Sequence, residues 1–144
     1  MLYDALSDPA GATPRDLIEA YAAELAAALD GADPATVADE VGVDESVVAA
    51  IAAGDADAIA TVPLADAAAV LEPHEDVPAD DIAYEVRDHL MMEMVTAILD
   101  VDTIAAEIGA DLTGQEVQQA LEGRTRLTLG ELADIQALMI ERTP

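Results

Sequence analysis

The fold is decided by residues 37–54, VADEVGVDESVVAAIAAG, which have the spacing of two short helices joined by a tight turn. Gly42 allows the positive φ with which a chain leaves a helix, and Asp44 is a favourable N-cap for the next one. Val48 and Ile51 recur at helical spacing, so we expect them to be buried against the first helix. A glycine closes the stretch. The pattern therefore predicts a helix–turn–helix unit.

A second copy of this pattern occupies residues 104–123, IAAEIGADLTGQEVQQALEG. Gly109 and Gly123 take the places of Gly42 and Gly54, and the turn between the helices is two residues longer. The paired glycines favour an internal duplication in which each half contributes four helices. We therefore divide the chain into an N-terminal helical repeat, residues 1–76, expected to be structural, and a C-terminal repeat, residues 77–144, carrying the second helix–turn–helix.

The composition favours packed helices over a β-sandwich. Hydrophobic residues make up 53% of the 144 residues, but aromatic residues only 2%, so alanine, valine, leucine, isoleucine and methionine must form the core. The absence of cysteine excludes disulfides, thiolate zinc sites and cysteine nucleophiles. No apolar run reaches the ~18 residues of a membrane span, and the first residues lack the basic and apolar blocks of a secretory signal. We expect an all-α cytoplasmic protein that does not associate with membranes.

Helix signals divide the chain further. Residues 55–62 are expected to form a loop, and the proline-rich, acidic residues 73–81 a linker. A long helix over about residues 80–99 is expected to join the two halves and is a candidate for a homodimer interface, because its apolar residues form a wide stripe. The expected helices cover residues 15–30, 34–42, 45–54, 64–72, 80–99, 102–109, 113–123 and 128–141.

The charge is strongly negative and dispersed along the chain. The sequence has 31 acidic residues, no lysine and five arginines, for a formal net charge of -26. This pattern is typical of proteins that work in molar salt, where the Debye length falls to ~3 Å and self-repulsion is screened. The alternative is a specialised acidic protein, such as a DNA mimic.

The helix–turn–helix pattern resembles that of the lambda-repressor-like family. The resemblance implies that the second unit reads DNA through residues 113–126, TGQEVQQALEGRTR. Glutamine can pair bidentately with adenine, so Gln115, Gln118 and Gln119 would contact base edges. Thr113, Arg124 and Arg126 would hold phosphates, as the corresponding positions of that family do. The expected partner is double-stranded DNA, and the expected function is transcription regulation.

The first unit departs from the family pattern, because Asp44, Glu45, Ser46 and Ala49 occupy the equivalent surface and its acids would repel phosphate. The alternative function is accordingly a protein-interaction or scaffolding module that does not bind DNA. Most of the chain also resembles a family of acidic haloarchaeal proteins with no assigned activity, through MLYDALSDP, RDHLMMEMVTAILDVDTIA and QEVQQALEGRTRLTLGELA.

Catalysis and cofactor binding have little support in the sequence. His89 lies between Glu85 and Glu93 on one helix face, a spacing that can hold a divalent metal. A histidine between carboxylates is more often a protonated ion-pair partner. We expect no enzymatic activity, no cofactor and no metal.

Overall fold

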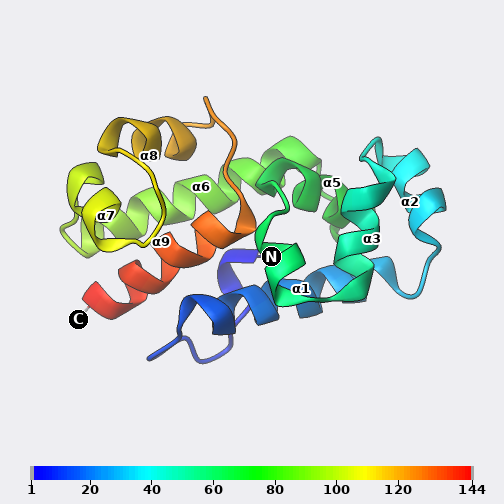
Figure 1. The fold of residues 1–144 in the computed structure, drawn as a ribbon, viewed down its shortest axis with the longest axis horizontal. Coiled ribbons are helices and arrows are strands. Elements are labelled where there is room, and N and C mark those ends of the chain that lie inside the picture. The colour runs from blue at the N-terminus through cyan, green and yellow to red at the C-terminus, as the bar shows by residue number, and fades with distance from the viewer. Residues whose placement is uncertain (1, 144) are drawn as a thin grey trace.

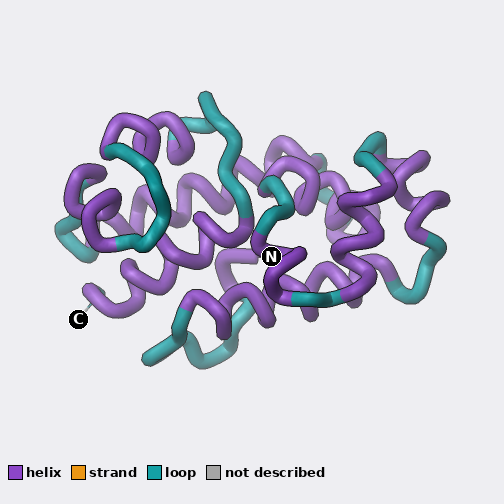
Figure 2. Tube along the Cα trace, in the orientation of Figure 1, coloured by secondary structure: helices purple, strands orange, loops and turns teal. Residues whose placement is uncertain are grey.

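The computed structural model describes residues 2–143, and these residues form a layered arrangement of helices (Figures 1 and 2). The predicted all-α class is confirmed for this part of the chain, in which the only β-contact is an isolated bridge between Pro63 and Thr128. The elements are a 3-10 helix η1 (Leu2–Asp4), α1 (Pro14–Leu29), α2 (Pro34–Val41), α3 (Glu45–Ala53), α4 (Ala56–Ala60), α5 (Leu64–Glu75), α6 (Ala79–Thr96), α7 (Val101–Glu107), α8 (Gly114–Leu121) and α9 (Leu129–Arg142).

Threonine N-caps start the three helices α1, α8 and α9. Thr13, Thr113 and Thr128 each accept a hydrogen bond from the backbone N–H three residues later, and the acidic residue at that position accepts one in return. These reciprocal capping boxes satisfy two N–H groups that a helix cannot bond internally. The starts of α1, α8 and α9 are therefore local properties of the sequence.

The predicted loop and linker are both wrong in part. Residues 56–60 form α4, capped by Asp55, and its Ile59 is fully buried. Helix α5 continues through Pro73 to Glu75, because a proline in the last turn removes only one backbone hydrogen bond. The linker shrinks to residues 76–78, where Asp76 has a φ of 55°.

The turns of the two expected helix–turn–helix units differ in backbone conformation. Gly42 ends α2 with a φ of 75°, as predicted. Gly109 does not have a positive φ, because α7 already ends at Glu107 and Ile108 is extended. The two extra residues of the second turn allow a more open connection into α8.

The halves exchange helices. The first helix of each half packs on the last helix of the other, so that α1 lies against α9 and α6 lies against α5. The short pairs α2/α3 and α7/α8 lie at opposite ends of the molecule (Figure 1). Buried residues of both halves form one hydrophobic core cluster. Whether residues 1–76 and 77–144 are separate units stays a prediction.

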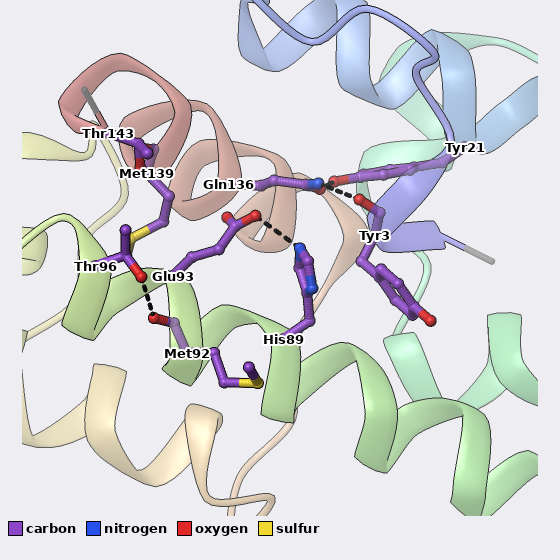
Figure 3. A network of polar contacts seen from close by, with 9 residues as sticks. All are labelled: Tyr3, Tyr21, His89, Met92, Glu93, Thr96, Gln136, Met139 and Thr143. Atoms are coloured by element: carbon purple, nitrogen blue, oxygen red, sulfur yellow. Dashed lines mark hydrogen bonds and ion pairs between the residues drawn. The ribbon is translucent and has the colours of Figure 1, made fainter.

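A buried polar network ties the N-terminal segment to this core (Figure 3). The Tyr21 hydroxyl of α1 donates to the side-chain oxygen of Gln136 on α9, and the Gln136 amide donates to the carbonyl of Tyr3 at 2.8 Å. Gln136 is only 4% exposed, so these bonds satisfy an amide that would otherwise be costly to bury. Burial raises the pKa of the Tyr21 phenol, which keeps it neutral.

Within residues 2–143, no helix combines the length and the apolar character needed to cross a lipid bilayer.

Candidate functional site

Helix α8 presents the residues that sequence analysis assigns to DNA. Gln115 and Gln118 are exposed, Gln119 is half-buried, and the opposite face of the helix packs inward through Val117, Ala120 and Leu121. A shallow hollow of about 230 Å³, here called the α8 hollow, is lined by Gln115, Gln118, Gln119, Glu122 and Arg124. The structure thus brings four of the six predicted residues together, with Thr113 at the N-cap of the same helix.

In the α8 hollow, Glu122 occupies the Gln118 amide and offsets the charge of Arg124. The Gln118 amide donates to one Glu122 oxygen at 2.8 Å, and the Arg124 guanidinium lies 3.2 Å from the other. These contacts are exposed, so each contributes little to stability. Their effect is on function, because both predicted readers must leave Glu122 before they can contact a base or phosphate.

A carboxylate lies beside the first turn of α8. Asp102 of α7 lies against Gly114 so closely that a Cβ on Gly114 would fall 2.0 Å from its Oδ1 atom. A carboxylate is favourable next to the positive end of a helix dipole.

Arg126 belongs to a different site. It lines a cavity of about 520 Å³ between α6, the start of α5 and the segment 122–127. Arg87 of α6, which sequence analysis did not single out, lines the same cavity. Its Nε donates to the Ala120 carbonyl at 2.9 Å, and half-burial lowers the pKa of its guanidinium. We call this space the Arg87–Arg126 cavity.

Helix α6 and the residues just after it expose part of the wide apolar stripe that the sequence predicts there. Val86 and Leu90 are buried, but Val95 and Ile98 are 75% and 91% exposed. Apolar residues occupy more of the circumference of α6 than the core covers, so a second row is left exposed to solvent. This row, here called the α6 stripe, consists of Tyr84, Met91, Val95 and Ile98, with Met92 beside it.

His89 forms an ion pair with Glu93 when protonated, with 2.6 Å between Nε2 and the carboxylate, and its ring stacks on Tyr3 (Figure 3). Among residues 2–143, no three histidine or acidic side chains are grouped so that they could hold a metal ion.

The comparisons place the chain in a family. A model described as "Family of unknown function (DUF5791)" matches residues 17–142, which is most of the chain, and the protein belongs to this family. No curated protein matches the chain, and no solved structure does either. The family description assigns no activity, so function has to be argued from the surface of the molecule.

Proposed function

We propose that this chain is a protein-interaction module that associates through the α6 stripe. The observation that carries the proposal is a row of large apolar side chains on one exposed helix face. Tyr84, Met91 and Val95 follow helical spacing and therefore share one side of α6, and Ile98 lies two residues after the end of the helix. Large contiguous apolar patches on soluble proteins mark interaction sites, whereas isolated exposed residues do not.

Ile98 strengthens this argument through its backbone. It has a φ of 58°, a conformation that is strained for a β-branched residue and natural for glycine. Its side chain is almost completely exposed, so packing within the described part of this chain does not explain an isoleucine there. An apolar side chain at a strained position is accounted for if a partner covers it.

The distribution of charge on α6 favours a second copy as the partner. The exposed acids Asp81, Glu85 and Asp88 lie in the first half of the helix. Apart from Tyr84, the residues of the α6 stripe lie in its second half or just after its end. Antiparallel pairing of two α6 helices about Val95 buries the apolar halves together. It separates the two copies of Asp88 by roughly 20 Å along the helices, well beyond the Debye length of ~8 Å at physiological salt.

A cytoplasm with molar salt is part of the proposal. The absence of lysine and the net charge of -26 suit a halophilic protein, because salt screens the repulsion between two acidic copies. Self-association should then strengthen as potassium chloride is added. The proposal needs no catalytic step and no cofactor.

A single-cysteine cross-linking experiment tests the interface directly, since the chain has no cysteine of its own. Val95→Cys should give a covalent dimer with a short bis-maleimide in molar potassium chloride, because Val95 lies at the centre of the pairing. Ala52→Cys, on the exposed face of α3, is the matched control and should stay monomeric. Equal cross-linking of both variants would exclude the α6 stripe as a specific interface.

Double-stranded DNA is a second candidate partner, favoured by the α8 hollow. The pairs α2/α3 and α7/α8 support an interpretation as tandem degenerate helix–turn–helix repeats joined by α6, with only the second presenting uncharged readers. A dimer through α6 would present two α8 helices, and binding requires them to meet major grooves one DNA turn apart, ~34 Å. Gln118→Ala combined with Arg124→Ala should abolish binding in a high-salt DNA-binding assay. Unchanged binding would rule out this face.

A further inference from the structure

The Arg87–Arg126 cavity is distinguished by the two arginines that line it. Of the five arginines, three form ion pairs: Arg15 with Glu19, Arg124 with Glu122, and Arg142 with Glu107. Within residues 2–143, Arg87 and Arg126 form no ion pair with a carboxylate, and both line this one cavity. In a chain with 31 acidic residues, two arginines without a carboxylate partner in the same space form a distinct local environment.

The first half of the molecule provides an internal comparison. The segment between Gly54 and Leu64 is four residues longer than the corresponding segment between Gly123 and Leu129. The longer segment forms α4, which packs on α1 and α9 and buries Ile59 there. The equivalent helices in the second half are α6 and α5, and these form the walls of the Arg87–Arg126 cavity. The space that a helix fills in one half is therefore open in the other.

The chemistry of the walls is suited to an anion. The Nε of Arg87 is bound to the Ala120 carbonyl, which fixes the guanidinium and leaves its terminal N–H groups without an ion-pair partner. The backbone at Gly123, which has a φ of 79°, passes close to the Arg87 guanidinium. A Cβ there would lie 3.7 Å from the Arg87 Cζ atom. Guanidinium groups bind carboxylates and phosphates through paired, charge-assisted hydrogen bonds.

Other groups in the cavity limit what can bind. Asp80 and Glu122 also line it, but Glu122 already holds Arg124. Tyr84 is 69% exposed and offers an aromatic face at the cavity wall. A volume of about 520 Å³ falls within the range of small-molecule sites and exceeds what a single inorganic ion needs.

We propose that the Arg87–Arg126 cavity binds a small organic anion. Its carboxylate or phosphate group contacts the guanidinium groups of Arg87 and Arg126, and an apolar body lies against Tyr84. The site shares Tyr84 with the α6 stripe, but its two arginines lie outside the stripe. It gives the second half of the molecule a ligand-binding function that the first half, filled by α4, does not have.

The test is a titration of the full-length protein in molar potassium chloride, followed by backbone and arginine side-chain NMR signals. Benzoate and phenyl phosphate are the probes, and phenol is the neutral control. At least one anion should give saturable shifts confined to residues 79–87 and 122–127, and phenol should give none. Saturation by benzoate alone assigns a carboxylate ligand, and saturation by phenyl phosphate alone assigns a phosphate ligand. Absence of saturable shifts with both anions, or equal shifts with phenol, would overturn the proposal.

Variants make the test specific. Arg126→Gln, at an exposed position outside the core, should weaken binding about tenfold or more, as expected for the loss of a charge-assisted hydrogen bond. Arg87→Gln should have at least the same effect. Arg124→Gln is the matched control, two residues from Arg126 but already paired with Glu122, and should bind normally. Equal weakening by Arg124→Gln and Arg126→Gln would show that only general electrostatics is involved and would contradict the proposal.

Discussion

Leu64 and Leu129, the first residues of α5 and α9, each donate a backbone hydrogen bond to the segment that precedes the other helix. The N–H of Leu64 donates to the carbonyl of Leu127 at 2.7 Å, and the N–H of Leu129 donates to the carbonyl of Val62 at 2.8 Å. These two bonds form the antiparallel bridge between Pro63 and Thr128 and tie the starts of α5 and α9 together.

The exchange predicts that neither half folds alone. A chain of residues 1–76 keeps the contact between α1 and α5 but loses the more extensive contacts of α1 with α9 and of α5 with α6. Circular dichroism in molar potassium chloride should show no cooperative thermal transition for residues 1–76 or 77–144, and mixing the two should restore one. A cooperative transition for either fragment alone, as for the full chain, would contradict the interlocked core.

The buried network around Gln136 predicts a non-additive pair of substitutions. Gln136→Leu should lower the free energy of unfolding by about 1–3 kcal/mol, because it leaves the Tyr21 hydroxyl and the Tyr3 carbonyl buried without a partner. Adding Tyr21→Phe should recover part of the loss, since it removes one of the two orphaned groups. Urea denaturation measures both changes. Strictly additive losses would contradict the network in Figure 3.

Ile98→Gly should separate stability from association. Glycine relieves the strain of the positive φ, worth roughly 1–2 kcal/mol, but adds flexibility to the unfolded chain, about 0.5–1 kcal/mol. We expect the dilute protein to be slightly more stable to urea while its self-association weakens. Ala49→Gly, at an exposed position in the middle of α3, is the control for backbone flexibility and should destabilise. Stronger self-association of Ile98→Gly than of the wild type would contradict the role of the side chain.

Local signals in the sequence predicted where helices begin and end better than they predicted how the helices pack. The capping boxes at Thr113 and Thr128 and the glycine at 42 act within one turn, so the sequence alone reveals them. Helix α4 was missed because five residues, ADAIA, give too short a periodic pattern, and its stability comes from burying Ile59 against α1 and α9. The contact of α1 with α9 joins segments distant in sequence and has no local signal.

The candidate sites likewise combine features that the local sequence predicts and features that depend on tertiary contacts. The exposure of Gln115 and Gln118 follows from the helical spacing of Val117 and Leu121, which point inward. The exposure of Ile98 could not be predicted, because an apolar pattern does not reveal whether the covering surface belongs to the same chain. Two features of the sequence could have pointed to Arg87. Cations are rare in this chain, and the segment after Gly123 is shorter than the corresponding segment after Gly54.

Asp134 on α9 should give the protein a pH-dependent stability. Partial burial, and then the nearby charge of Glu131, raise the pKa of its carboxyl in the folded state above the ordinary 3.8. A raised folded-state pKa means that its contribution to stability is present below the unfolded pKa and is lost as the pH rises through the folded pKa. Asp134→Asn should therefore be more stable than the wild type at neutral pH, with no advantage well below pH 3.8.

Urea denaturation at the two pH values measures this difference. Asp39→Asn, on the exposed part of α2, corrects for the loss of one negative charge from a highly acidic chain. An advantage of Asp134→Asn that is the same at both pH values would show that ionisation of Asp134 is not responsible.

Sedimentation velocity of the wild type and Val95→Asp in molar potassium chloride tests the central claim, self-association through the α6 stripe, most directly. Val95 is 75% exposed, so the substitution leaves the core intact, and it places a charge at the centre of the pairing. We predict a concentration-dependent dimer for the wild type, and for Val95→Asp a monomer with the helical circular dichroism of the wild type. A wild-type protein that stays monomeric at every concentration and salt level, or a Val95→Asp variant that dimerises equally well, would contradict the account.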